Sequence, residues 1–235
     1  MYNQKAMSQA YSFFQNSSER IEELLGKDFS PKLKLGKRLF DILFSIAILI
    51  FLSPLIFLIG IIIKLTSPGP VFYSHPRVKL GGKPFHLVKF RTMYIDADEK
   101  LHLLLDKNPV IKMEWESFRK IRNDPRVTSF GKFLRKLSLD ELPQFWNALK
   151  GDISIVGPRP VKEEEILCYY KEKSSKILAV RPGITGIWQV SGRNTLSMEE
   201  RVKLEVSYIE RQSFCFDLWM IVKTIPAILF SKGAF

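Results

Sequence analysis

The chain has 235 residues, a formal net charge of +12 and two cysteines, Cys168 and Cys215, that stand alone. This length suits one domain of about 190 residues behind an N-terminal extension, and isolated cysteines without clustered histidines argue against a disulfide framework or a zinc site. The positive charge indicates an anionic partner, either a phospholipid surface, a nucleotide or a nucleic acid, and does not choose among them.

Residues 1–35 form the expected N-terminal extension, which is polar and mixed in sign. A weakly amphipathic helix is expected around Glu19–Leu25. We do not expect a cleaved signal peptide, because the first apolar run begins only at Ile42 and is too long for one.

The apolar run Ile42–Ile63 contains no charged residue. It is long enough to cross a bilayer, since about 20 apolar residues suffice. Pro54 lies near its middle, where it removes a backbone hydrogen bond and clashes with the preceding turn, and Ser53 can satisfy a carbonyl that this break leaves free. We therefore expect a membrane helix over residues 39–65 that is broken at Ser53-Pro54.

Basic residues lie on both sides of this run. Those that precede it are Lys32, Lys34, Lys37 and Arg38, and no acidic residue occurs between Lys64 and Arg91. Short basic flanks resist translocation, so both ends are expected on the cytoplasmic side, with the helix entering one leaflet and returning to the same face. An ordinary kinked transmembrane helix with its short N-terminal tail outside is the alternative.

Between residues 71 and 120 the pattern changes from strand to helix. Val71–Phe90 alternates around Gly81-Gly82, which is typical of a β-hairpin with a two-residue turn. Asp96 to about Lys120 then has a helical pattern, until Asn123-Asp124-Pro125 interrupts it. One small hairpin among helices predicts an α+β, mainly helical fold.

Asp140-Glu141 is the candidate catalytic pair. Ser138 followed three residues later by Glu141 has the form of a capping box, which predicts a helix from Leu139 that stops at Gly151. Asp140 would then lie in the first turn, where the helix dipole favours an ionised, nucleophilic carboxylate. The alternative is that both acids serve only the helix start.

The C-terminal segment Phe214–Phe230 is apolar and aromatic, but it contains Asp217, Lys223 and Pro226. It is too short and too interrupted to span a membrane. We expect a helix that lies in the membrane interface, with Trp219 in the lipid and Lys223 extending outward. A buried core helix is the alternative, because both kinds of helix share the same apolar period.

Three loops combine arginine with glycine or proline. They are Gly157-Pro158-Arg159-Pro160, Arg181-Pro182-Gly183 and Gly192-Arg193-Asn194. Such loops let backbone N–H groups approach a phosphate while a guanidinium binds it with two parallel hydrogen bonds. Together with the acidic pair and the membrane segment, they indicate an enzyme that handles phosphate groups at a membrane.

In these features the chain resembles the bacterial monotopic polyprenyl-phosphate phosphoglycosyl transferases, the initiating sugar transferases, over residues 36–233. The motifs before the acidic pair are Lys37-Arg38-Leu39-Phe40-Asp41, Ser53-Pro54, Ser67-Pro68-Gly69-Pro70, Lys89-Phe90-Arg91-Thr92-Met93 and Asp124-Pro125-Arg126. The later motifs are Leu134-Arg135, Ser138-Leu139-Asp140-Glu141-Leu142-Pro143-Gln144, Gly151-Asp152, Gly157-Pro158-Arg159-Pro160, Arg181-Pro182-Gly183-Ile184-Thr185-Gly186 and Trp188-Gln189-Val190-Ser191-Gly192-Arg193. A series of this length in one order is very specific.

The resemblance implies a catalytic domain over residues 36–235 with a re-entrant membrane helix and amphipathic interfacial helices. It places the protein on the cytoplasmic face of the bacterial inner (cytoplasmic) membrane. The implied reaction is a Mg²⁺-dependent transfer of a sugar 1-phosphate from a UDP-sugar to undecaprenyl (polyprenyl) phosphate, through a covalent aspartyl-phosphosugar intermediate, at the start of a cell-surface glycan pathway.

The resemblance also implies roles for individual residues. Asp140 matches the nucleophile and Glu141 its metal-linked partner, with Asp140, Glu141 and Asp217 as metal ligands. The expected substrate-binding residues are Lys89, Arg91, Arg135, Arg159, Arg181 and Arg193. Where the family often has Leu-Asp-x-x-Tyr, this chain has Leu204-Glu205-Val206-Ser207-Tyr208, so Glu205 keeps the charge on a longer side chain.

Two functions without catalysis remain as alternatives. The chain could be a membrane-tethered module that binds nucleic acid or anionic lipid, or a scaffold that recruits other glycan enzymes. Our preferred interpretation includes no nucleic-acid partner and leaves a homo-oligomer open. The insertion Asp96–Asn123 resembles the longer, hexose-transferring members of the family, which favours galactose or glucose as the sugar.

Overall fold

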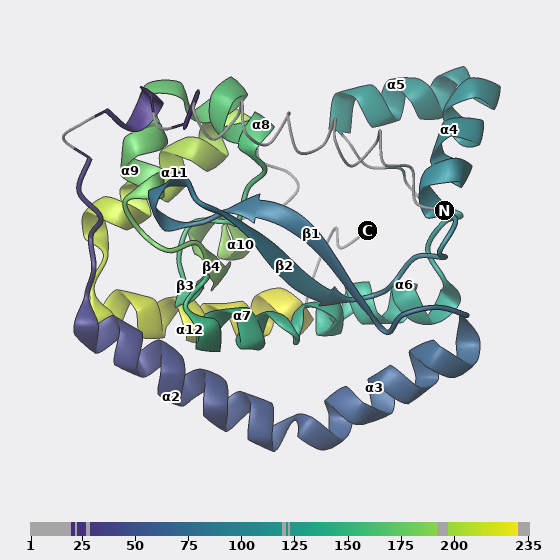
Figure 1. The fold of residues 1–235 in the computed structure, drawn as a ribbon, viewed down its shortest axis with the longest axis horizontal. Helices are drawn as coiled ribbons and strands as arrows, with labels where there is room; N and C mark the ends of the chain where they lie inside the picture. The colour runs from purple at the N-terminus through teal and green to yellow at the C-terminus, as the bar shows by residue number, and fades with distance from the viewer. Residues whose placement is uncertain are drawn as a thin grey trace.

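The computed structural model describes residues 20–21, 23–26, 29–118, 121, 123–191 and 197–229, and its fold is mainly helical (Figure 1). Of the helix expected around Glu19–Leu25, residues 20–21 and 23–25 are helical, and the rest lies outside the described residues. Ile21 is buried against the core of the domain.

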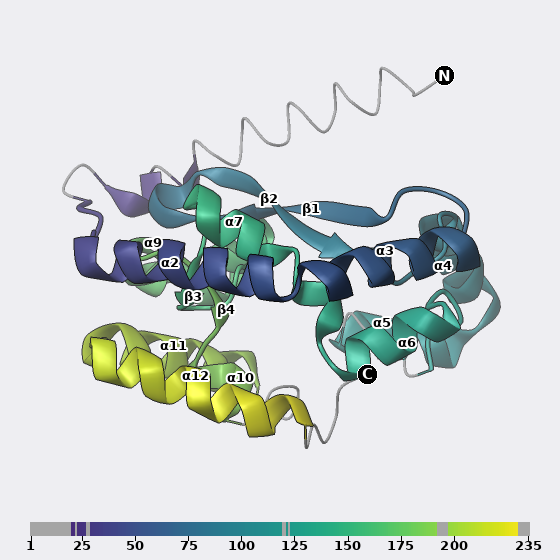
Figure 2. The ribbon, with the colours of Figure 1, turned by 90° about the horizontal axis from the view of Figure 1, so that it is seen from below.

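Helices α2 (Leu35–Phe51) and α3 (Ser53–Thr66) form a bent pair along one side of the molecule (Figures 1 and 2). Their axes differ by 61° across Leu52, so the break predicted at Ser53-Pro54 is confirmed. Pro54 lies in the first turn of α3, and the Ser53 hydroxyl donates to the Ile50 carbonyl at 2.8 Å. Within the described residues no single helix is long and apolar enough to cross a membrane, while this bent pair has the length and composition to do so.

Strands β1 (Phe72–Val78) and β2 (Pro84–Phe90) form the predicted antiparallel hairpin, in a register that places Tyr73 opposite Lys89. The two-residue turn is wrong. Residues 79–83 join the strands, with a short 3-10 turn, η1 (Leu80–Gly82), in which Gly81 and Gly82 have φ of 73° and 75°. A side chain at Gly82 would also clash with Ile21, so the longer turn is fitted to the N-terminal helix.

The helical segment predicted from Asp96 is two helices, α4 (Ala97–Lys107) and α5 (Pro109–Phe118). Asn108 separates them because the following proline disfavours helical backbone at this residue. The Asn108 side chain then accepts hydrogen bonds from the backbone N–H groups of Val110 and Ile111, which starts α5.

The segment around the acidic pair consists of α6 (Ser129–Lys136), the 3-10 turn η2 (Leu139–Glu141) and α7 (Gln144–Lys150). The capping-box prediction is wrong, because Ser138 has a left-handed backbone (φ 54°) and its side chain makes no capping hydrogen bond. The regular helix therefore begins at Gln144 and not at Leu139. Its predicted end is confirmed, since Gly151 has the positive φ of 90° that suits glycine.

A second sheet, which the sequence did not predict, pairs β3 (Ser154–Val156) in parallel with β4 (Gly183–Thr185). Between them lie α8 (Glu163–Glu165), the π-helical turn η3 (Ile166–Tyr170), the 3-10 turn η4 (Lys171–Lys173) and α9 (Ser174–Leu178). The main hydrophobic core surrounds β3 and includes Ile153, Ile155 and Val156. Gly157 and Gly183 pass so close that a side chain on either would meet the backbone of the other segment.

The last described elements are α10 (Ile187–Val190), α11 (Met198–Arg211) and α12 (Phe214–Leu229), and α12 runs beside α2 (Figures 1 and 2). One face of α12 is buried, with Met220 fully inside the core. The other face exposes Trp219, Val222 and Ile225, whose exposed fractions are 47%, 64% and 58%. The helix therefore joins features of both predictions, a core helix on one side and an apolar outer surface on the other.

Candidate active site

The hairpin and the η2 turn bring the predicted acidic pair against Lys89. The Lys89 ammonium donates to Glu141 Oε1 at 2.6 Å and lies 3.9 Å from Asp140 Oδ2. Asp140 is 8% exposed, whereas 36% of the Glu141 side chain is exposed. One cation therefore faces two adjacent carboxylates, of which one is nearly enclosed and the other is accessible.

The η2 turn is held in place by apolar contacts on both sides of the acids. Leu139 and Leu142 pack against a small cluster formed by Ile59, Phe90 and Leu134 with their neighbours. Ile59 belongs to α3, so the second half of the bent helix pair lies directly against the turn that carries Asp140. The sequence Leu-Asp-Glu-Leu is explained by this arrangement, because its half-buried leucines pack against the apolar cluster while its acids face Lys89.

Arg135 completes the polar surroundings of Asp140. Its Nε donates to the Thr92 hydroxyl at 2.9 Å, which fixes the guanidinium between the end of β2 and α6. Burial lowers the pKa of Arg135, whereas the negative charges of Asp140 and Asp124 both raise it. Asp124 in turn accepts a bidentate pair of hydrogen bonds from Arg126.

Burial raises the pKa of Asp140 to about 6 and outweighs the opposing effect of the two nearby cations. The charges of Lys89 and Arg135 lower this pKa, and the like charge of Glu141 raises it. The carboxylate is therefore ionised above about pH 6, and at neutral pH it is an anion that water solvates poorly. A poorly solvated carboxylate is suited to nucleophilic attack on phosphorus.

Among the other predicted substrate-binding residues, two have structural contacts. Arg91 is 7% exposed and donates to the carbonyls of Ser67 and Pro68, so it holds the loop after α3. Arg181 donates through Nε to the Gly151 carbonyl at the end of α7. Neither contact involves Asp140 or Glu141.

Arg159 lies beside Trp188, and Arg193 lies outside the described residues. The Arg159 guanidinium is 5.0 Å from the centre of the Trp188 ring, and its backbone N–H donates to Glu205. Glu205 is fully buried and also accepts from the Tyr170 hydroxyl at 2.7 Å. The longer side chain at this position therefore serves to fix the loop that carries Arg159.

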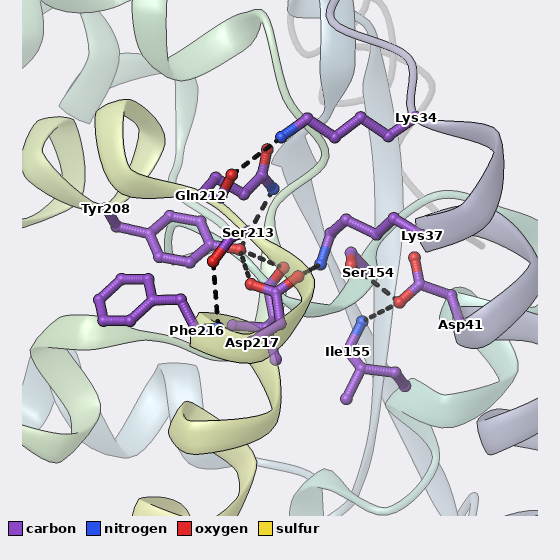
Figure 3. Close-up of polar contacts among 11 residues, drawn as sticks. Lys34, Lys37, Asp41, Ser154, Ile155, Tyr208, Gln212, Ser213, Phe216 and Asp217 are labelled. Atoms are coloured by element: carbon purple, nitrogen blue, oxygen red, sulfur yellow. Dashed lines mark hydrogen bonds and ion pairs between the residues drawn. The ribbon is translucent and has the colours of Figure 1, made fainter.

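Asp217 does not join the acidic pair, which corrects the predicted three-carboxylate metal site. Its carboxylate is 3% exposed, forms an ion pair with Lys37 at 2.5 Å and accepts from the Tyr208 hydroxyl at 2.7 Å (Figure 3). In the part of the chain that the structure describes, no three His, Cys, Asp or Glu side chains form a group that could hold a metal ion. Asp217 is a buried tie between α12 and α2.

Sequence reasoning did not single out Thr92, His75 or Arg77. Thr92 positions Arg135. His75 and Arg77 lie on β1. The positive charges of Arg77, Lys89 and Arg159 all lower the pKa of His75. The alternation of Tyr73, His75 and Arg77 along one face of a strand was the signal that could have found these residues.

Comparison with known proteins gives a consistent result. Residues 32–231 match the model of a family described as bacterial sugar transferase. The chain is 45% identical over 201 residues to the exopolysaccharide production protein ExoY of Sinorhizobium fredii, covering 86% of this chain and 88% of that protein. It is 43% identical over 217 residues to the undecaprenyl-phosphate galactose phosphotransferase of Salmonella typhimurium, covering 92% of this chain and 44% of that protein. It is 37% identical over 211 residues to the undecaprenyl-phosphate glucose phosphotransferase of Komagataeibacter xylinus, covering 86% of this chain and 37% of that protein.

Proposed function

The chain belongs to the bacterial sugar transferase family and is an enzyme of the phosphoglycosyl transferase kind, and we propose that it transfers a sugar 1-phosphate from a UDP-sugar to undecaprenyl or another polyprenyl phosphate. The observation that carries this proposal is the enclosed Asp140 carboxylate beside Glu141 and Lys89. Such a carboxylate can attack phosphorus, and the Lys89 ammonium can stabilise the negative charge of a diphosphate.

The proposed reaction has two displacements at one phosphorus atom. In the first, a carboxylate oxygen of Asp140 bonds to the sugar-linked phosphorus, and the bond from this phosphorus to the bridging oxygen breaks, so UMP leaves with the bonding electrons. In the second, a phosphate oxygen of the polyprenyl phosphate attacks the same phosphorus, and the bond to Asp140 breaks. The products are polyprenyl-diphosphate-sugar and the free carboxylate, and no net proton is needed.

Lys89 and Arg135 are placed to stabilise the charge that moves in these steps. Lys89 already lies within 3.9 Å of Asp140, and Arg135 is fixed by Thr92. A preorganised cation in a site that excludes water stabilises developing charge more strongly than one in bulk solvent. Loss of either cation is therefore expected to slow the transfer without removing the nucleophile.

The acidic pair also fits Mg²⁺. In sites that handle phosphate, this ion is usually held by one or two carboxylates together with the substrate's own phosphate oxygens, so a third carboxylate is not required. Glu141, with 36% of its side chain exposed, and Asp140 are the residues that would hold it. When bound, the ion would neutralise part of the charge on the diphosphate.

The bent helix pair supports a membrane placement. We propose that α2 and α3 enter the cytoplasmic leaflet of the inner membrane and return to the same face, with α12 lying in the interface. The 61° bend, the exposed Phe51 and Phe57 near it, and the apolar outer face of α12 support this placement. The acceptor lipid would then approach Asp140 along α3, which packs against the η2 turn.

A donor panel tests the function. The purified protein is mixed with polyprenyl phosphate, Mg²⁺ and one UDP-sugar at a time, and both UMP release and the organic-extractable sugar are measured. We expect UDP-galactose or UDP-glucose to react faster than their N-acetylated counterparts, because similar proteins are galactose and glucose phosphotransferases. If no UDP-sugar gives UMP, the chain is a binding module or a scaffold, and alanine at Asp140 would leave its cellular role intact.

A further inference from the structure

A second group of basic residues lies beyond Lys89 along the hairpin and is not used by the chemistry at Asp140. We call it the Trp188 cluster, and it consists of His75, Arg77, Arg159, Lys162, Trp188 and Arg201. The guanidiniums of Arg159 and Arg201 lie 5.0 Å and 4.3 Å from the centre of the Trp188 ring. The positive charge of Arg159 lowers the pKa of Arg77, Arg201 and His75, so these side chains lie close enough to interact electrostatically.

Three buried nitrogen atoms in this cluster have no hydrogen-bond partner in the part of the chain that the structure describes. They are His75 Nε2, Trp188 Nε1 and Arg201 Nε. Trp188 is 5% exposed, so water does not readily replace a missing partner. A buried donor or acceptor without a partner costs about 1–3 kcal/mol, and three such atoms in one place indicate a ligand that supplies the partners.

The charge of the cluster identifies an anionic ligand. Four of its members are Arg or Lys, and the negative charges of Glu165 and Glu205 act on its arginines. Glu205 is committed to the Tyr170 hydroxyl and the Arg159 backbone, and Glu165 accepts from the Lys162 backbone. Burial and the surrounding cations lower the pKa of His75 to about 3, so its imidazole is neutral at pH 7 and adds a hydrogen-bonding group and no further charge.

The position of the cluster relates this ligand to the reaction at Asp140. Tyr73, His75 and Arg77 lie on one face of β1, and the strand covers about 13 Å from the first to the last at about 3.3 Å per residue. Lys89 is opposite Tyr73 in the sheet, and its charge lowers the pKa of His75. Its ammonium also lies 3.9 Å from Asp140 Oδ2. An extended nucleoside diphosphate anchored at Asp140 would follow this row.

The chemistry of the cluster favours a nucleotide over a lipid phosphate. In Figure 1, α8, which begins after Lys162, and α11, which carries Arg201, lie in the upper part of the view, while α2 and α3 follow the lower edge. Besides its cations, the cluster offers the indole N–H of Trp188 and the neutral imidazole of His75, which suit the ribose or base of a nucleotide.

We propose that the Trp188 cluster binds the nucleotide half of the donor, the part that leaves as UMP. Arg77 and Arg201 bind its phosphate, and the nitrogen atoms of His75 and Trp188 form hydrogen bonds with its ribose or base. This proposal rests on the proposed function, since it assigns one part of that donor to residues that the reaction at Asp140 does not use. The cluster thereby fixes the leaving group while Asp140 attacks the phosphorus.

The test measures UMP binding to the purified full chain by calorimetry and the KM for each substrate. Arg201→Ala is expected to weaken UMP binding by about tenfold or more, as expected for loss of a charged hydrogen bond, and to raise the KM for the UDP-sugar. Trp188→Phe keeps the ring and removes only the N–H, so a smaller loss of a few fold is expected. Arg201→Lys, which keeps the charge, should recover part of the affinity. The KM for polyprenyl phosphate should stay unchanged in all three.

The matched controls are Arg211→Ala at the exposed end of α11 and Trp219→Phe on the exposed face of α12, and neither should change UMP binding. The proposal is overturned if folded Arg201→Ala and Trp188→Phe bind UMP as the wild type does, or if they raise the KM for polyprenyl phosphate instead. Failure of the proposed function looks different, because the wild type itself would then neither bind UMP nor release it from any UDP-sugar.

Discussion

Replacing Asp140 by asparagine separates catalysis from stability at the proposed nucleophile. An amide cannot attack phosphorus, so Asp140→Asn should abolish UMP release. Burial has raised the pKa of Asp140 from 3.8 to about 6, which means that folding favours the protonated acid. This contribution to stability is fully present below pH 3.8 and is lost as the pH rises through about 6. Above that range the folded wild type carries a buried anion that the asparagine variant lacks.

The size of this effect follows from the shift. A shift of one pKa unit is 1.36 kcal/mol, so two units correspond to at most about 3 kcal/mol of unfolding free energy. We therefore expect Asp140→Asn to be inactive and yet more stable than the wild type at pH 8, with a difference that shrinks toward pH 4. The measurement is UMP release together with denaturant unfolding followed by tryptophan fluorescence at both pH values.

A control and two contrary outcomes define the test. Asp106→Asn removes a carboxylate at an exposed position of α4 and should leave activity and stability at pH 8 close to those of the wild type. If Asp140→Asn retained a tenth of the wild-type rate, a loss of only about 1.4 kcal/mol in transition-state stabilisation, Asp140 would not be the nucleophile. If the variant were less stable than the wild type at pH 8, burial would not be the cause of the raised pKa.

Three further predictions follow from the same site and from the bent helix pair. UDP-sugar alone should leave a phosphosugar adduct on Asp140, seen as a mass increase of the intact protein; ternary-complex kinetics with no adduct would indicate direct transfer. The value of kcat/KM should rise with pH around a midpoint of about 6, because only the ionised Asp140 attacks. Lys89→Met should move this midpoint upward, since the charge of Lys89 lowers the pKa of Asp140. An unchanged or lower midpoint would contradict the assignment. Single cysteines near residues 30 and 80 should react only with reagents that reach the cytoplasm. Pro54→Leu should straighten the helix and expose the cysteine near residue 30 to the outside in part of the population. Outside labelling at residue 30 without that substitution would establish a simple spanning helix.

The features that the sequence predicted correctly depend on local chemistry. The bend at Ser53-Pro54 follows from the missing backbone donor of proline, and the stop at Gly151 from a positive φ. The acidic pair was named from its place at an expected helix start and Lys89 through the resemblance, but the enclosure of Asp140 could not be read from the pattern. Ser138 shows why, since its left-handed backbone turns the expected capping box into a 3-10 turn.

The features that the sequence missed depend on contacts between distant residues. Strands β3 and β4 have three residues each, and no periodic pattern identifies strands of this length before their pairing is known. Asp217 was assigned to the metal site through the resemblance, by its position in the closing helix. Its partner Lys37 is 180 positions away, so the ion pair that explains its burial becomes visible only in the folded chain.

Polar residues at the start of α2 hold the bent helix pair in a fixed position relative to the segment that carries the nucleophile. The Arg38 guanidinium donates to the carbonyls of Ala148 and Leu149, the last turn of the helix that follows η2. Asp41 accepts from the Ser154 hydroxyl and the Ile155 backbone in β3, as Figure 3 shows. These contacts anchor the first half of the bent pair to the core.

The second half of the pair is held by apolar contacts instead. Ile59 and Ile63 of α3 are buried against Leu134 and pack with the leucines on either side of Asp140. A change in the bend angle would therefore move α3 relative to the η2 turn while α2 stays anchored. If α3 guides the lipid phosphate toward Asp140, the bend at Pro54 sets the depth at which the phosphate meets the carboxylate, and a straightened helix would lose the second displacement before it loses the first.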